Sequence, residues 1–312
     1  MGYSYLAILD LGSNSTRMVV EKIASDGSYE EVTRVKEDTR LSEGMGPQKI
    51  LQPKAITRVI TALSKFQQLY QRYRDIQIIA IATAAVRQAT NQKAFLAQVQ
   101  AAIGVQVKVL SGDDEAYYDY LGATQALNLK NAILLDTGGA SVELGLIREG
   151  HKEELISVPF GAVNLSEQFN LKDQVKSADL FRCARFIQKQ YNDIAWFQSG
   201  RNLPIVLLGG ANRTLARVDR TSQAMTRIQD FHGYRMTSER VLNWFERVLA
   251  NNFQERQAID GLEASRADII VGGWLPLVML INLLDSERVT FSESGVREGL
   301  ITEFIQKTKV RS

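Results

Sequence analysis

The sequence predicts an α/β protein made of two related domains, and three observations support this. Its 312 residues are about twice the length of an ordinary domain. Short apolar strands alternate with amphipathic helices, which is typical of sheets covered by helices. A strand that ends in aspartate and turns through glycine occurs twice, at Asp10 and at Asp136, which are 126 positions apart. The second domain is therefore expected to repeat the first.

The first domain is expected to open with a β-hairpin. Tyr5–Asp10 is an apolar run, and Thr16–Ile23 alternates as a second strand after a polar turn. Apolar residues recur at helical spacing over Pro53–Tyr73, with proline near the helix start. The remaining elements predicted here are the strand Ile76–Ala82, the helix Ala94–Ile103 and the strand Val105–Leu110. This alternation indicates a mixed or parallel sheet.

The second half starts the pattern again. The strand Ala132–Asp136 precedes a glycine turn and the strand Val142–Ile147. The later predicted elements are the strand Glu154–Val158, helical residues Ala178–Tyr191, the strand Ile205–Leu208, a turn at Gly209-Gly210 and a last helix, Val296–Lys307. We place the boundary within Gly122–Leu129, which gives domains 1–124 and 125–312. The last helix is expected near the interface between them.

Composition excludes several classes of protein. Hydrophobic residues make up 45% and charged residues 23% of the chain, as in ordinary globular proteins. The longest apolar runs are interrupted and too short to span a membrane, and the N-terminus lacks a basic signal region. Cys183 is the only cysteine, which rules out an internal disulfide. The net charge of +2 does not favour nucleic-acid binding. We therefore expect a cytoplasmic protein with neither membrane nor nucleic-acid partners.

Both hairpin turns have the composition of phosphate-binding loops. The first consists of Gly12, Ser13, Asn14 and Ser15, and the second of Gly138, Gly139, Ala140 and Ser141. Such turns can direct backbone N–H groups at a phosphate while the preceding carboxylate, Asp10 or Asp136, orders a magnesium-bound water. One copy alone could be an ordinary hairpin, but two facing loops can grip one phosphate chain. Paired turns of this kind resemble the actin and sugar-kinase superfamily.

A metal site is expected beside these loops. Glu143 follows Ser141 by two positions, so it points to the same face of its strand and could join Asp136 around a metal; otherwise it is a solvated strand position. The candidate ligands Asp10, Asp136 and Glu143 are all oxygen donors, which favours Mg²⁺ or Mn²⁺. The acidic stretch Ser111–Asp119 and the arginine-rich stretch Arg201–Arg240 would suit a metal site facing an anion site, although solvated helix faces also produce such runs.

Four further segments give a specific family resemblance. They are Thr39-Arg40-Leu41-Ser42-Glu43-Gly44, Thr83-Ala84-Ala85-Val86-Arg87-Gln88-Ala89-Thr90-Asn91, Ser111-Gly112-Asp113-Asp114-Glu115-Ala116 and Ser294-Gly295-Val296-Arg297-Glu298-Gly299. In their order along nearly the whole chain, they resemble the exopolyphosphatase and guanosine-pentaphosphate phosphatase family, in a short two-domain form. The resemblance implies an actin-like α/β fold of duplicated domains with an interdomain cleft.

The resemblance also implies roles for individual residues. Glu115 would be the general base, unless it is only a favourable acid at a helix start. Asp114 stands where the family has a glutamate, which keeps the negative charge but shortens the side chain. Arg87 would bind substrate phosphates through its planar guanidinium, or else be an exposed helix-start arginine. Gly209 and Gly210 occupy the place of a nucleotide-binding turn but depart from the family's usual Gly-Gly-Thr. Arg213, with Arg217 and Arg220 at helical spacing, could attract a polyanion or form a solvated face.

The preferred hypothesis is a hydrolase that removes the terminal phosphate of inorganic polyphosphate. Hydrolysis of guanosine pentaphosphate (pppGpp) is the alternative because it would use the same motifs. An actin-like ATP-dependent kinase and a non-catalytic sensor of guanosine polyphosphates are weaker alternatives, since the acidic residues needed for hydrolysis are present. His232 matches a family signature but is assigned a structural role. The sequence leaves monomer and homodimer open.

Overall fold

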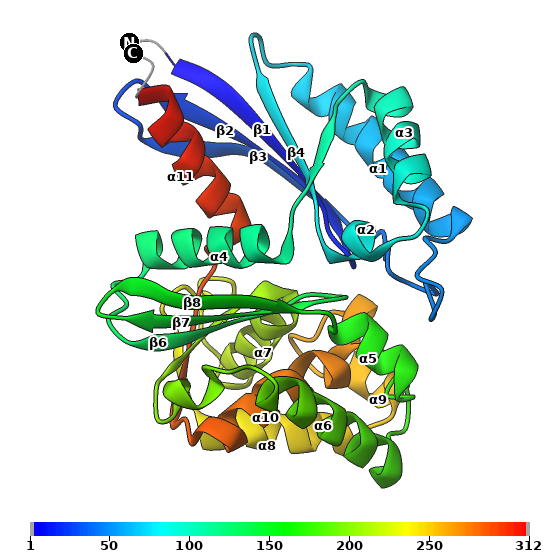
Figure 1. Ribbon diagram of the computed structural model, residues 1–312, viewed down its shortest axis with the longest axis vertical. Helices are drawn as coiled ribbons and strands as arrows, with labels where there is room; N and C mark the ends of the chain where they lie inside the picture. Colours follow the sequence, from blue (N-terminus) through cyan, green and yellow to red (C-terminus); the bar gives the residue numbers. More distant parts are fainter. Residues whose placement is uncertain (1–2, 310–312) are drawn as a thin grey trace. The chain divides into compact units, whose positions relative to one another are not determined.

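The computed structural model describes residues 3–309 (Figure 1). It divides into two compact units, one of residues 3–111 with 305–309 and one of residues 112–304. Both are α/β, as predicted. The division falls between Ser111 and Gly112, not between residues 124 and 125. The physical reason is that helix α4 (Gly112–Ala126) packs on strands β7 and β8 of the second unit, so it belongs with that unit's core.

The first unit contains a five-stranded sheet in the order β3-β2-β1-β4-β5. The strands are β1 (Tyr3–Leu11), β2 (Thr16–Ala24), β3 (Tyr29–Glu37), β4 (Gln77–Ala82) and β5 (Val107–Val109), and the helices are α1 (Pro53–Tyr70), α2 (Ala84–Gln88) and α3 (Gln92–Ile103). Strand β1 pairs antiparallel with β2 and parallel with β4. Phe66 of α1 and Phe95 of α3 are fully buried in the core. The predicted hairpin is confirmed, whereas the charged, exposed edge strand β3 carries no apolar pattern from which to predict it.

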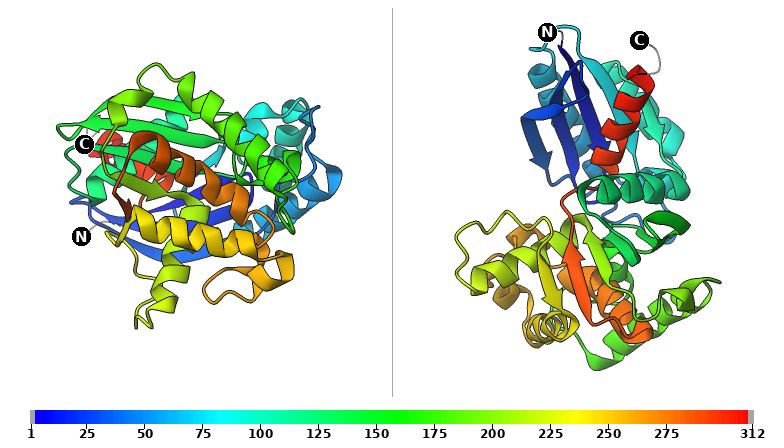
Figure 2. Two further views of the ribbon diagram at one scale, coloured as in Figure 1. Left: turned by 90° about the horizontal axis from the view of Figure 1, so that it is seen from below. Right: turned by 90° about the vertical axis from the view of Figure 1, so that its left-hand side faces the viewer.

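The second unit contains a six-stranded sheet in the order β10-β11-β9-β6-β7-β8. Its strands are β6 (Ala132–Thr137), β7 (Val142–Arg148), β8 (His151–Val158), β9 (Ile205–Leu208), β10 (Arg235–Thr237) and β11 (Arg288–Phe291). The helices that follow α4 are α5 (Ala162–Gln168), α6 (Ser177–Asn192), α7 (Gly209–Ser222), α8 (Ser238–Ala250), α9 (Phe253–Gln257) and α10 (Ile270–Leu284). Figures 1 and 2 show α4 on one side of strands β6–β8 and helices α6, α8 and α10 on the other.

Two differences from the predicted elements affect the candidate site. Gly209 and Gly210 do not form a free turn, because helix α7 begins at Gly209 directly after β9. The last helix, α11 (Val296–Lys309), runs from the second unit into the first. None of the helices in the described part of the chain is long and apolar enough to cross a membrane.

Candidate phosphate-binding and carboxylate site

The first predicted phosphate loop joins β1 to β2. The N–H of Gly12 donates to the carbonyl of Ser15 at 3.1 Å, and a Cβ on Gly12 would lie 2.9 Å from that same oxygen, so the tight turn requires glycine. The Ser13 hydroxyl accepts from the N–H of Ala85 at 3.2 Å, which ties the loop to the start of α2. Asp10 precedes the loop at the end of β1. The loop and Asp10 thus form one rigid corner of the first unit.

Asn14 marks the binding face of this loop. Its side chain is buried, and neither its amide nitrogen nor its amide oxygen has a hydrogen-bond partner in the described structure. A buried polar group without a partner costs about 1–3 kcal/mol. A phosphate oxygen could accept from the amide nitrogen, and a bound water could donate to the amide oxygen. The observation therefore supports the assignment of Gly12–Ser15 to phosphate binding.

The second predicted loop repeats this geometry in the second unit. The N–H of Gly138 donates to the carbonyl of Ser141 at 3.0 Å, the counterpart of the bond in the first loop. The carbonyls of Gly138 and Gly139 accept from the first N–H groups of α5, on Ala162 and Val163, at 2.9 and 2.8 Å. Ala140 is buried at this turn.

Four carboxyl groups influence one another in the second unit. Asp136 and Glu143 lie directly opposite each other on β6 and β7. Burial first, and then repulsion from Glu115 and Asp136, raises the pKa of Glu143 well above its ordinary value, although hydroxyl donation from Ser141 and Ser157 opposes this. Glu115 lies in the first turn of α4 and is buried. The structure therefore brings together three of the predicted residues, Glu115, Asp136 and Glu143.

Asp119 is the fourth member of this group and was not predicted. Burial, followed by Asp136, Glu143 and Glu115, raises the pKa of its carboxyl well above the ordinary value. Asp119 follows Glu115 by four positions, so both lie on one face of α4. This spacing is the signal in the sequence that places Asp119 beside Glu115.

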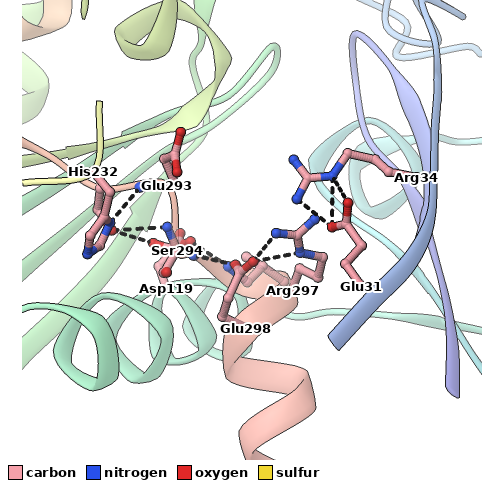
Figure 3. Close-up of polar contacts among 11 residues, drawn as sticks. Glu31, Arg34, Asp119, His232, Glu293, Ser294, Arg297 and Glu298 are labelled. Carbon is pink, nitrogen blue, oxygen red and sulfur yellow. Dashed lines mark hydrogen bonds and ion pairs between the residues drawn. The ribbon is translucent and has the colours of Figure 1, made fainter. Parts of the chain in front are cut away.

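Asp119 also joins α4 to the start of α11 (Figure 3). Its Oδ1 accepts from the N–H of Val296 at 3.0 Å, while the Glu298 carboxylate accepts from the N–H of Gly295 at 2.8 Å. A Cβ on Gly122 would lie 2.2 Å from the Gly295 carbonyl oxygen, so the two helices cross at glycines. The Ser294–Gly299 signature thus fixes a helix start beside the carboxyl groups.

The two glycines that begin α7 lie against charged groups. A Cβ on Gly209, whose φ is +86°, would be 2.1 Å from Asp136 Oδ1, and one on Gly210 would be 2.3 Å from the Arg266 guanidinium. Arg266 is buried and pairs with Glu263 at 3.4 Å. Glycine is therefore needed at both positions for close approach, rather than for a free turn.

The predicted polyanion patch on α7 is largely occupied by protein groups. Arg217 pairs with Glu263 at 2.8 Å. Arg220 donates to the Arg227 carbonyl at 2.7 Å and lies over the Tyr234 ring. Both arginines are half-buried, as is Arg213. The three arginines therefore do not form a freely solvated face.

Arg87 and His232 both make contacts with the backbone. Arg87 Nη1 donates to the Leu110 carbonyl at 3.0 Å, one residue before the Ser111 signature. His232 Nε2 lies 3.2 Å from the Ala126 carbonyl, and the N–H of Glu293 donates to its Nδ1 at 3.3 Å. His232 thus links the end of α4 to the residues before α11, which agrees with the structural role predicted for it.

A divalent cation fits the donor chemistry of Asp136 and Glu143. Like charges directly opposite on adjacent strands are destabilising, and oxygen donors suit Mg²⁺ or Mn²⁺. The third predicted ligand, Asp10, belongs to the other unit. Within residues 3–309, no three or more His, Cys, Asp or Glu side chains are grouped so that they could hold a metal ion. Each unit thus carries only part of the predicted ligand set.

Comparisons with known proteins identify the family of this chain. The model of the Ppx/GppA phosphatase family matches residues 19–308. The chain belongs to the Ppx/GppA phosphatase family. A crystal structure of an Aquifex aeolicus Ppx/GppA family member is 26% identical, covers 98% of this chain and 99% of its own, and has a TM-score of 0.80. A Cytophaga hutchinsonii exopolyphosphatase structure is 20% identical over 97% and 98% of the two chains, with a TM-score of 0.88. The predicted actin-like α/β fold is confirmed.

Two curated relatives are longer than this chain. A guanosine-5'-triphosphate,3'-diphosphate pyrophosphatase of Vibrio parahaemolyticus is 29% identical over 97% of this chain and 60% of its own length. A bifunctional 3-dehydroquinate synthase/phosphatase of Fusobacterium nucleatum is 25% identical over 96% of this chain and 46% of its own. The chain thus spans between about half and three fifths of the length of these two relatives.

Proposed function

We propose that this chain hydrolyses the terminal phosphoanhydride bond of inorganic polyphosphate. The observation that carries the proposal is the pair of glycine loops with matching hydrogen bonds, at Gly12–Ser15 and Gly138–Ser141, together with the buried carboxyl groups near the second. Phosphoryl transfer depends chiefly on positioning and on stabilising the charge that spreads over the phosphate oxygens. Two loops that present N–H groups supply both.

Glu115 is the proposed general base. Its place at the start of α4 fixes the carboxylate within a rigid helix, and a carboxylate can take the proton of an attacking water. Asp136 and Glu143, with Asp10 from the first unit, would hold a magnesium or manganese ion, which supplies charge neutralisation for the phosphate when bound. Arg87 is the proposed phosphate ligand among the cations, because a planar guanidinium can bind phosphate oxygens in a bidentate way.

Guanosine pentaphosphate is the second candidate substrate, because the Vibrio parahaemolyticus relative is named for a pyrophosphatase of guanosine 5'-triphosphate 3'-diphosphate. The place for a base would be near Gly210, where the Arg266 guanidinium lies. The loops and carboxyl groups recognise phosphate alone and require no base. Polyphosphate is therefore the simpler substrate for the described features.

The test is phosphate release by purified protein from tripolyphosphate, longer polyphosphates and guanosine pentaphosphate, assayed side by side with Mg²⁺ and after chelation. We expect release that requires the cation and a higher kcat/KM for polyphosphate. Equal activity after exhaustive chelation would overturn the metal proposal. A higher kcat/KM for guanosine pentaphosphate at every ionic strength would select the second candidate, and no release from any of these substrates would reject both.

The metal ligands can be tested by binding as well as by activity. Asp136→Asn should weaken Mn²⁺ binding in calorimetry, because it removes a charged oxygen donor. Arg87→Ala is the matched comparison: it should leave Mn²⁺ binding nearly unchanged and chiefly raise KM. Equal Mn²⁺ affinities in Asp136→Asn and the unmodified protein would exclude Asp136 as a ligand.

A further inference from the structure

The segment after β3 is hydrogen-bonded along the first phosphate loop. The N–H of Arg40 donates to the Asn14 carbonyl at 2.8 Å, and the N–H of Ser42 donates to the Ser13 carbonyl at 2.9 Å. The hydroxyls of Thr16 and Thr39 are 2.8 Å apart and buried. The Thr39–Gly44 signature, which has no role in the proposed chemistry, is thus the support on which this loop rests.

One guanidinium fixes this supporting segment. Arg58 of α1 donates through Nε to the Thr39 carbonyl at 2.7 Å and through Nη2 to the Arg40 carbonyl at 3.2 Å. Nη2 also pairs with the Glu43 carboxylate at 2.8 Å. Arg40 itself has a φ of +46°, a left-handed conformation that costs a residue other than glycine about 1–2 kcal/mol. Arg58 thus donates to the carbonyls of Thr39 and Arg40, which lie on the two sides of the strained Arg40 Cα.

These bonds form a continuous chain from the guanidinium to the loop. In a trans peptide the N–H of one residue points opposite to the carbonyl of the residue before it. Arg58 therefore donates to the carbonyl of the Thr39–Arg40 peptide. The N–H of that same peptide donates to the carbonyl of the Asn14–Ser15 peptide. The far end of that second peptide is the N–H of Ser15. Hydrogen bonds in a chain polarise one another. The positive charge of Arg58 therefore makes the Ser15 N–H a stronger hydrogen-bond donor.

We propose that Arg58 is a positioning residue that orients and polarises the first phosphate loop through the Thr39–Arg40 and Asn14–Ser15 peptides. The inference rests on the proposed function, since it assumes that this loop binds the substrate's phosphate. Arg58 makes no contact with substrate. Its effect is on the terminal phosphate common to both candidate substrates, so polyphosphate and guanosine pentaphosphate are affected alike.

The experiment compares Arg58→Gln, Arg58→Lys and Glu43→Gln with the unmodified protein. The control is Arg34→Gln, which removes an exposed arginine of the same unit that, among the described residues, pairs with Glu31 three positions away (Figure 3). Tripolyphosphate and guanosine pentaphosphate serve as substrates. Tripolyphosphate binding is also measured by calorimetry, which does not require turnover.

Arg58→Gln should raise KM and the tripolyphosphate Kd by about tenfold, the equivalent of one lost charge-assisted hydrogen bond. Arg58→Lys should recover part of this, because a single ammonium keeps the charge but cannot reproduce the guanidinium fork. Glu43→Gln should raise KM less than Arg58→Gln does, since it removes one partner of the guanidinium but keeps both bonds to the carbonyls. Arg34→Gln should have no effect.

Amide hydrogen exchange over residues 38–45 provides a readout that does not depend on the activity. Faster exchange of this segment in Arg58→Gln than in Arg34→Gln is expected, because the guanidinium donors that hold its carbonyls are lost. Unchanged exchange, or an unchanged tripolyphosphate Kd, overturns the role of Arg58 whatever the enzyme's activity. If the unmodified protein binds tripolyphosphate with the expected dependence on Arg58 but hydrolyses neither substrate, the proposed function fails and the positioning role stands.

Discussion

Replacing Gly209 by alanine should damage the carboxylate site far more than it damages the fold. Gly209 has a φ of +86°, and a Cβ there would lie 2.1 Å from Asp136 Oδ1 and 2.9 Å from the Thr137 carbonyl. Ordinary contact begins near 3.4 Å, so the Asp136 carboxylate must move by about 1 Å. A misplacement of that size can cost about 10²-fold in rate.

Gly104→Ala is the matched control. Gly104 ends α3 with a φ of +69°, but a Cβ there would meet nothing within 4 Å. Both substitutions place alanine in a left-handed conformation, at about 1–2 kcal/mol each. Only Gly209→Ala adds collisions with the Asp136 carboxylate and the Thr137 backbone, so the difference between the variants reports the effect of these contacts.

The assay combines urea unfolding, kcat/KM for tripolyphosphate and Mn²⁺ affinity by calorimetry. Gly104→Ala should lose stability and retain both activity and Mn²⁺ binding. Gly209→Ala should lose about 10²-fold in kcat/KM and bind Mn²⁺ more weakly. If Gly209→Ala stays within threefold of Gly104→Ala in both measures, the reasoning about Asp136 is refuted.

Three further predictions follow from the site. Glu115→Gln should lower kcat by about 10²–10⁴-fold with little change in tripolyphosphate Kd, and a loss below tenfold in the purified variant contradicts the general base. Asp119→Asn keeps an acceptor for the Val296 N–H but removes a buried charge. The pKa of Asp119 is raised in the folded state. The contribution of its protonated carboxyl to folding stability is therefore complete below its ordinary pKa of about 4. This contribution is lost as pH rises through the folded pKa. In metal-free buffer the variant should therefore gain stability over the unmodified protein at pH 8 but not at pH 4, and an equal change at both would be inconsistent with burial of the charge. Rising salt should lower kcat/KM more steeply for long polyphosphates than for guanosine pentaphosphate, since exposed charges are screened over about 8–10 Å; parallel curves would indicate that no extended basic track is used.

The sequence was most informative where local geometry alone decides the structure. Strand β1, the turn at Gly12 and strand β2 could be predicted because apolar alternation and a glycine turn specify a hairpin within a few residues. Helix α4 was harder to assign. The predicted boundary 122–129 falls at its end, because only the packing of α4 on β7 and β8 decides which unit it joins. Propensity carries no information about such tertiary contacts.

Asp119 and Arg58 illustrate two different reasons for missing residues of the site. Asp119 lies four positions after Glu115, and that spacing on a helix could have been used. Arg58 had no such signal, because its acceptors are backbone carbonyls, which every residue carries. The meeting of α1 with the segment after β3 depends on the fold of the whole unit. Side chains that act on the backbone are therefore hidden from motif analysis.

The two phosphate loops share a local structure but not a support. In each, a glycine N–H donates to the carbonyl three residues later, and that repetition follows directly from the repeated sequence. The first loop rests on the segment 39–44 held by Arg58, whereas the carbonyls of the second loop accept from the N–H groups at the start of α5. A phosphate loop needs its carbonyl groups satisfied by the protein so that its N–H groups remain available to the anion. Any partner can meet that requirement, so the loop can be repeated in sequence while its partners differ, and variants of Arg58 should alter the first loop without a counterpart in the second.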